Sequence, residues 1–361
     1  MANSILKEIT FTPHAFEKNV ALENERKFGD LINALIDIID SGIIIRISNK
    51  WQKIIDEFID KYSYNEKNEL KSIFKQLKDK KILVTYPTSK DIGDCETDWI
   101  NKVKEINYTR TFDAIVASKD LYIAKQINHF DKKTFKKNSA KIGKQTKDFV
   151  NNMLAPILSY TEIVKIMDPY FSLIPQKGNK KRYTDSLEII CKNLANHHGI
   201  KDIGLIEIQT SIKAMTEGYG RYAQFKWQLT DKWPNIIKKL EDKYGHTIII
   251  NIWEESNKHR WHDRWIITQQ CGVYIGKGND IDEWTDSTWG LLEWEDLPNI
   301  ENKFDKNRGI FTFIGSVTSS NIYKKQNPYF IETYCEDEDR KNKEKYSNDL
   351  KALQKNIKYK K

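Results

Sequence analysis

The sequence predicts an α/β protein, and three observations support that fold class. Short runs rich in β-branched residues, such as residues 43–48 and 247–253, alternate along the chain with segments that carry apolar residues at helical spacing. Helix boundaries are marked as well, because Pro234 opens and Gly245 follows the amphipathic segment between them. The chain has 361 residues, enough for two domains. We therefore expect a mixed sheet flanked by helices, preceded by a second α/β domain.

The composition changes along the chain and divides it into parts. Residues 131–148 are polar and carry seven lysines, which favours an exposed basic connector. The C-terminal end is highly charged with few apolar residues, a composition typical of a peripheral helix or a disordered tail. We expect the following parts: an α/β domain over 1–130, a basic linker over 131–150, a second domain over 151–330 and a charged tail over 331–361.

Each domain is expected to contain strands and helices in alternation. In the first domain the pattern is that of a parallel sheet. Its expected strands are 43–48, 82–87 and 112–118. In the second domain we expect strands at 162–171, 203–211, 247–253, 264–268, 272–278 and 308–316, and helices at 183–199 and 233–245.

The net charge indicates which kinds of molecule the protein binds, and the cysteines indicate the cellular compartment in which it works. A net charge of +8 favours a polyanionic partner, either nucleic acid or an anionic lipid surface, although a lysine-rich proteome would give the same value. No apolar run is long enough to cross a membrane, and the first residues lack the apolar stretch of a signal peptide. The four cysteines lie far apart, which favours reduced thiols in a cytoplasmic protein over disulfides or a zinc site. We expect neither a metal nor a cofactor.

The residues most suggestive of chemistry lie between His262 and Asn279. A guanidinium such as that of Arg264 offers a bidentate fork to the oxygens of a phosphoryl group. The amide of Asn279 adds a neutral donor, and a neutral imidazole such as that of His262 is a nucleophile for phosphorus. Because residues two apart on a strand share a face, His262 and Arg264 are expected to point the same way. A surface cluster of ion pairs is the alternative interpretation.

The spacing of these residues resembles the motif of the phospholipase D superfamily. That motif is HxK, four residues, Asp, six residues, then GSxN. His262 and Arg264 match the HxK part, while Gln269 stands at the Asp position. After six residues come Gly276, Lys277, Gly278 and Asn279, with Lys277 at the Ser position. The resemblance implies catalytic roles for His262, Arg264 and Asn279 and phosphate binding by Gly276, Lys277 and Gly278, and the two departures weigh against full catalytic competence.

Within this superfamily the chain is most similar to the MIT C-terminal domain, over residues 155–315. In that domain a strand ends in DPY, and HDR and a glycine-rich stretch follow. Here these are Asp168-Pro169-Tyr170, then His262-Asp263-Arg264, then Gly272 to Asp280. The eukaryotic module is regarded as a membrane and phosphoinositide binder. Asp168, Tyr170 and Gln209 follow or end expected strands and are expected to support the site, because ligands bind at the carboxyl ends of strands in open α/β sheets.

Two functions follow from these residues, and a scaffold in which the cluster is vestigial is the third alternative. The first is a metal-independent phosphodiesterase, which we expect to be a nuclease with a phosphohistidine intermediate and a role in microbial antiphage defence. Such hydrolases use two histidine motifs, and because the chain shows one, this function implies a homodimer. The second is a module that binds phosphate-bearing ligands without turnover. Tryptophans near the motif, among them Trp261, Trp284 and Trp289, either stack on bases or pack the core. For residues 1–130, a PIN-like domain and a degenerate phospholipase-D-like half remain open.

Overall fold

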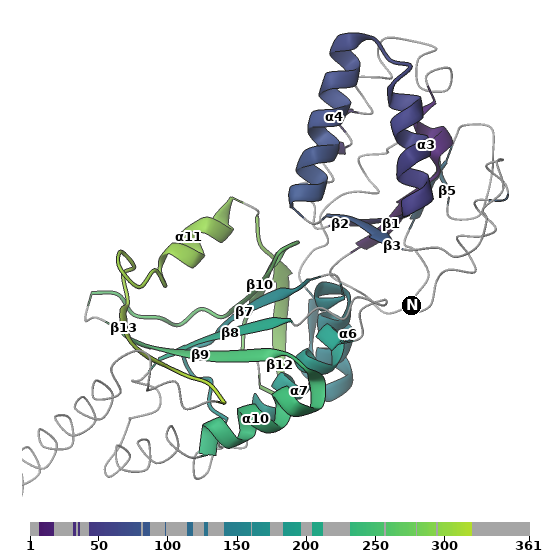
Figure 1. Ribbon diagram of the computed structural model, residues 1–361. Helices are drawn as coiled ribbons and strands as arrows, with labels where there is room; N and C mark the ends of the chain where they lie inside the picture. The colour runs from purple at the N-terminus through teal and green to yellow at the C-terminus, as the bar shows by residue number, and fades with distance from the viewer. Residues whose placement is uncertain are drawn as a thin grey trace, which may run out of the picture.

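The computed structural model describes two α/β regions, each with its own sheet (Figure 1). The described residues are 7–17, 32–33, 35–36, 43–80, 82–86, 98, 114–117, 126–128, 141–159, 161–173, 183–195, 204–211, 232–255, 258–278, 280–293 and 295–319.

The N-terminal sheet is parallel throughout, as the sequence predicts. Its order is β3-β2-β1-β4-β5, and β1 pairs with both β2 and β4. Two helices pack their apolar faces on this sheet, and α4 begins with a capping box between Ser63 and Glu66. The elements are β1 (Lys7–Phe11), η1 (Pro13–Phe16), β2 (Ile43–Ser48), α3 (Asn49–Ile59), α4 (Tyr64–Asp79), β3 (Leu83–Tyr86), β4 (Ala114–Ala117) and β5 (Gln126–Asn128).

The C-terminal sheet is mixed and has eight strands in the order β13-β9-β8-β7-β10-β11-β12-β6. The central strands β7, β8 and β9 are parallel, and the others join antiparallel. The strands are β6 (Lys141–Gln145), β7 (Ile163–Met167), β8 (Leu205–Ser211), β9 (Thr247–Glu254), β10 (Trp265–Thr268), β11 (Gly272–Ile275), β12 (Asp282–Leu291) and β13 (Thr312–Val317). The predicted α/β class with a mixed sheet flanked by helices is therefore confirmed.

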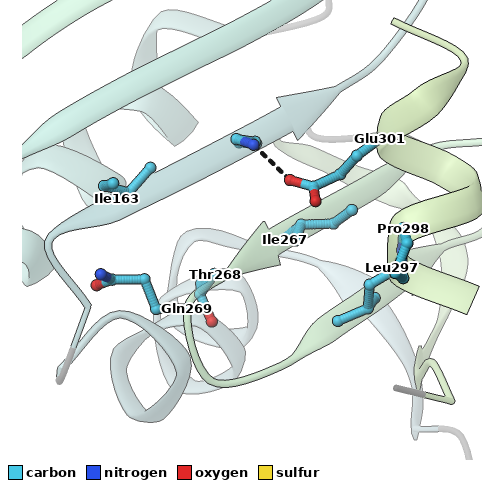
Figure 2. Close-up of a pocket in the computed structure, with 8 residues that line it drawn as sticks. Ile163, Ile267, Thr268, Gln269, Leu297, Pro298 and Glu301 are labelled. Atoms are coloured by element: carbon cyan, nitrogen blue, oxygen red, sulfur yellow. Dashed lines mark hydrogen bonds and ion pairs between the residues drawn. The ribbon is translucent and has the colours of Figure 1, made fainter. Parts of the chain in front are cut away.

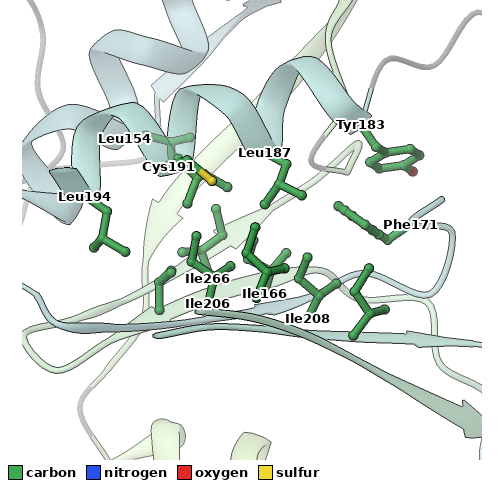
Figure 3. Close-up of a cluster of buried hydrophobic side chains, with 14 of the residues drawn as sticks. Leu154, Ile166, Phe171, Tyr183, Leu187, Cys191, Leu194, Ile206, Ile208 and Ile266 are labelled. Carbon is green, nitrogen blue, oxygen red and sulfur yellow. The ribbon is translucent and has the colours of Figure 1, made fainter. Parts of the chain in front are cut away.

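Apolar side chains cover both faces of this sheet. Helices α6 (Lys147–Leu158), α7 (Tyr183–Ala195) and α10 (Trp233–Tyr244) lie on one face, where Leu187 and Cys191 of α7 pack on Ile166 and Ile206 (Figure 3). On the other face, the short helix α11 (Asp296–Asn302) packs with an aromatic cluster. That cluster contains Trp253, Trp261, Trp265, Phe304 and Phe311.

The expected basic linker over residues 131–150 is wrong from Lys141 onward. Residues 141–145 form the edge strand β6, and α6 begins at Lys147 with Thr146 as its N-cap. A polar edge strand with lysines is hard to distinguish from a connector, because charged residues are what protect sheet edges from pairing with other chains. The second domain therefore begins before residue 151. The rest of the expected linker and the charged tail lie outside the described residues.

Strands β1 and β5 of the first domain have no counterpart among the sequence expectations, and neither do β12 and α11 of the second. In β12 the register shifts between Asp282 and Asp286, so the alternation of buried and exposed residues is interrupted. Helix α11 has seven residues and contains Pro298, which leaves too little helical periodicity to recognise. The remaining strands of the second domain match the expected ones, but β7, β11 and β13 are three or four residues shorter at one end, and β9 and β13 each extend one residue beyond the expected range.

Cys191 and Cys271 are free thiols, in agreement with the expectation of reduced cysteines. Burial raises the pKa of Cys191 to about 12 and that of Cys271 to about 11, so both remain protonated at neutral pH. The other two cysteines lie outside the described residues. Within the described part of the chain, no helix has the length and apolar character needed to cross a membrane.

His246 connects α10 to the core as a buried neutral imidazole. Its Nδ1 accepts a hydrogen bond from the Gly204 amide at 3.2 Å, so Nε2 carries the proton and donates it to the Cys191 carbonyl at 3.2 Å. Burial lowers the pKa of His246 below its usual 6.5. The folded protein therefore binds a second proton on His246 less readily than the unfolded chain does. The contribution of neutral His246 to the free energy of unfolding is complete above pH 6.5 and declines as the pH falls below that value.

We predict that the free energy of unfolding falls as the pH is lowered from 7 to 5, and that His246→Gln removes part of this dependence. Glutamine offers an acceptor and a donor but does not titrate. Urea unfolding at several pH values measures both curves, and parallel curves for the two proteins would contradict the role of His246.

Candidate phosphate-binding site

Three strand ends bring the motif residues together at one edge of the C-terminal sheet. Asp168 follows β7, Arg264 precedes β10 and Gly276 follows β11. Strand β10 runs antiparallel to both neighbours, with Trp265 opposite Met167 on one side and Tyr274 on the other. The end of β7, the start of β10 and the end of β11 therefore lie side by side.

Arg264 and Asp168 form an ion pair at the centre of this edge. Arg264 Nε lies 3.8 Å from Asp168 Oδ1, and Nη1 donates to the Gly276 carbonyl at 3.2 Å. Asp168 is fully buried, while 18% of the Arg264 side chain is exposed. A buried carboxylate requires a compensating partner, so this pair fixes the arginine in place.

The aromatic ring of Tyr170 supports the guanidinium from another side. Arg264 Cζ lies 4.9 Å from the centre of that ring, and the Tyr170 amide donates to Asp168 Oδ1 at 2.9 Å. Among the described residues, Gly276 is the only hydrogen-bond acceptor of the guanidinium. Its Nη2 therefore remains available to an anionic ligand.

The glycine-rich loop after β11 closes over the ion pair. Gly278 has φ +106°, and a Cβ there would lie 3.0 Å from Asp168 Oδ2 and 3.3 Å from Arg264 Nε. Only glycine combines this backbone conformation with so close an approach. Gln145 of β6 holds the loop by donating to the Gly278 carbonyl at 2.6 Å.

Three residues of this edge were not expected to take part in it. Asp280 is buried, and its Oδ1 would lie 3.0 Å from a Cβ at Gly278. The Tyr183 phenol is also buried; burial first, and then the charges of Asp168 and Asp280, raise its pKa well above 10. Asp280 stands within the glycine-rich stretch of the motif, so its position was a usable signal. Gln145 gave no signal, because it belongs to the segment interpreted as a linker.

His262 lies beside the ion pair but outside it. It is exposed and belongs to the segment that precedes β10, so the expectation that it lies on the strand itself is wrong. Trp261 anchors this segment by packing against Phe304 and Phe311 and by donating from its indole to the Asp263 carbonyl at 2.7 Å. Among the described residues, none hydrogen-bonds the imidazole, and the Asp168 carboxylate forms its ion pair with Arg264.

Gln269 lies at the opposite end of β10 from Arg264. Its Oε1 accepts the Glu162 amide at 2.9 Å and so links β10 to the start of β7. Figure 2 shows Gln269 at the rim of a mostly apolar pocket between β7, β10 and α11, with the Lys165–Glu301 ion pair on another wall. The position at which the phospholipase D motif has Asp is therefore remote from Arg264.

The remaining expected residues have different outcomes. Lys277 is exposed, and its amide donates to Ser287 Oγ at 3.3 Å. Gln209 supports Asp168 through its backbone, since its carbonyl accepts the Asp168 amide at 3.1 Å, but its side chain accepts the Trp253 indole proton. It was expected to support the site and does so only through the backbone. Asn279 lies outside the described residues.

The chain matches no protein-family model and no curated protein sequence.

We predict that Gly278→Ala is more destabilising than Gly245→Ala. Both positions have a positive φ, but a Cβ at Gly245 meets nothing within 4 Å, whereas at Gly278 it meets the buried ion pair. The shared backbone cost is about 1–2 kcal/mol, and the crowding at Gly278 should add at least ~1 kcal/mol. Urea unfolding of the two variants measures the difference, and equal losses would show that the loop does not press on the ion pair.

Proposed function

We propose that the C-terminal domain is a phospholipase-D-like module that binds the phosphate groups of nucleic acid. The observation that carries this proposal is the fixed guanidinium of Arg264, held by Asp168, Gly276 and the ring of Tyr170. A pre-positioned fork loses little conformational entropy when it binds two phosphate oxygens. The ligand would approach the guanidinium from its solvent-exposed side.

One exposed lysine near Arg264 and the net charge of the whole chain favour a polyanionic ligand, while Asp263 and Asp280 are the acidic residues near Arg264 that its ion pair with Asp168 leaves over. Lys277 is exposed on the loop directly after Gly276, and the chain has a net charge of +8. Lysines that contact phosphates release counterions, which makes binding strong at low salt and weak at high salt. Nucleic acid presents such phosphates in series, so we favour it over an isolated anion.

The environment of His262 favours binding over turnover. A nucleophilic imidazole is usually oriented by a third group that fixes its tautomer. Of the two buried carboxylates at this edge, Asp168 is engaged by Arg264, and no hydrogen bond joins His262 to either of them or to another described residue. A single chain therefore supplies a phosphate clamp with an unoriented imidazole beside it.

Phosphodiester cleavage without a metal is the second candidate, and one observation favours it. His262 is solvent-exposed two residues before Arg264, where an imidazole from a second copy of the chain has access to it. In a homodimer one His262 would attack phosphorus and the other would protonate the leaving oxygen. The position of Gln269, remote from Arg264, removes one of the two objections that the sequence raised against catalysis.

We predict that Arg264→Lys weakens the binding of labelled oligonucleotides at least about tenfold, because a point charge replaces the bidentate fork. The lysine keeps a positive charge beside buried Asp168, so folding is better preserved than in Arg264→Ala. Fluorescence anisotropy measures the affinity, and circular dichroism confirms that the variant is folded. Unchanged affinity in a folded variant would refute the proposed site.

We further predict that Lys277→Ala reduces the slope of log affinity against log salt by about 0.7–0.9, the value for one lost phosphate contact. Lys238→Ala is the matched control, because Lys238 is an exposed lysine on α10, over the covered face of the sheet. Its slope should equal that of the unsubstituted protein. Equal slopes for all three proteins would exclude Lys277 from the interface.

For the second candidate, cleavage of labelled DNA and RNA in EDTA is compared with that by His262→Ala. The binding proposal predicts no cleavage by either protein. Cleavage that the substitution abolishes would establish the phosphodiesterase, and sedimentation analysis would then be expected to show a dimer.

A further inference from the structure

Trp284 is the most exposed of the large apolar side chains in the described part of the chain, with 82% of its surface accessible. The other tryptophans for which burial is described are core residues: Trp233, Trp253, Trp261, Trp265 and Trp289. An exposed indole does not contribute the free energy that burial of such a large apolar surface would give. Packing of the hydrophobic core therefore does not explain why a tryptophan stands at position 284.

The fold places Trp284 next to the phosphate-binding edge. Strand β12 begins at Asp282, which lies opposite Gln145, and Gln145 donates to the Gly278 carbonyl at 2.6 Å. Trp284 follows two residues later, so its backbone is within about 7 Å of Asp282. It lies where the register of β12 shifts between Asp282 and Asp286, and such a bulge redirects a side chain out of the sheet.

We propose that Trp284 is a stacking platform for an unpaired nucleobase whose neighbouring phosphate binds Arg264. This inference rests on the proposed function and narrows its ligand to single-stranded nucleic acid. Aromatic side chains beside a basic groove are how many proteins bind single strands, because every base offers a π face. In a duplex the bases are stacked on one another and are not available to the indole.

The charges near Trp284 favour a base over an anionic membrane as its occupant. Asp286 is exposed close to Trp284 in the chain, and its cross-strand neighbour is Lys144. Asp282 and Glu283 also directly precede Trp284. Carboxylates on both sides of the indole oppose its insertion among anionic headgroups. They also repel the phosphates of a bound strand, so the phosphates would lie at Arg264 and Lys277 and only a neutral base would lie on Trp284.

The test is the binding of labelled single-stranded and duplex oligonucleotides of equal length by the full chain. Trp284→Ala should weaken single-strand binding about fivefold to a hundredfold and leave duplex binding within about twofold. Trp284→Phe should retain most of the affinity. The matched control is Tyr64→Ala, because Tyr64 is an 80% exposed aromatic residue on α4 of the other sheet; its binding should be unchanged.

The outcomes separate this inference from the proposed function. Loss of affinity in Arg264→Lys with none in Trp284→Ala would overturn the stacking platform and leave the phosphate site standing. Equal losses for single strands and duplexes in Trp284→Ala would also overturn it. Binding of phosphatidylserine vesicles that depends on Trp284, without an effect on single strands, would assign the indole to a membrane instead.

Discussion

The buried ion pair between Asp168 and Arg264 is the interaction on which the candidate site depends. It joins the end of β7 to the start of β10, and the Gly276 carbonyl ties it to the end of β11. A carboxylate with no exposed surface is stable only while its cation stays beside it. The same ion pair thus stabilises this edge of the sheet and holds the Arg264 guanidinium where we propose that a phosphate binds. A substitution that breaks the pair is therefore expected to affect both folding and binding.

The rest of the edge is built around that pair. The large apolar cores on the two faces of the sheet fix the strands, and the aromatic cluster around Trp261 fixes the segment that carries His262. Gly278 passes closer to the ion pair than any residue with a side chain would allow, and Gln145 holds it there. These contacts account for the fixed position of the Arg264 guanidinium, which we propose binds phosphate, and His262 lies beside it with fewer contacts.

The sequence predicted the features that depend on local pattern. Buried β-branched runs identified the parallel strands, and the order of short motifs identified Asp168, Arg264 and Gly276 as neighbours although almost a hundred residues separate the first two. Features that depend on contacts between residues far apart in the sequence were not predicted. Lysine-rich β6 resembles a connector until its pairing with β12 is known, and Gln145 becomes significant only through its bond to Gly278, 133 residues away. Gln209 and Gln269 do not contact Arg264 through their side chains, although the sequence placed both in the candidate site. Their position at a strand end does not determine their hydrogen-bond partners, which depend on the packing around them.

The central claim is that Arg264 and the glycine loop together bind a phosphate group. The most direct measurement is a titration of the ¹⁵N-labelled full chain with inorganic pyrophosphate, followed by NMR, with Arg264→Lys used to assign the arginine Nε signal. The account predicts saturable shifts of Arg264 Nε and of the Gly276 and Gly278 amides, and no shift at Gly245, which lies beyond α10. Shifts spread over exposed lysines, with Arg264 and the glycine loop unaffected, would contradict it.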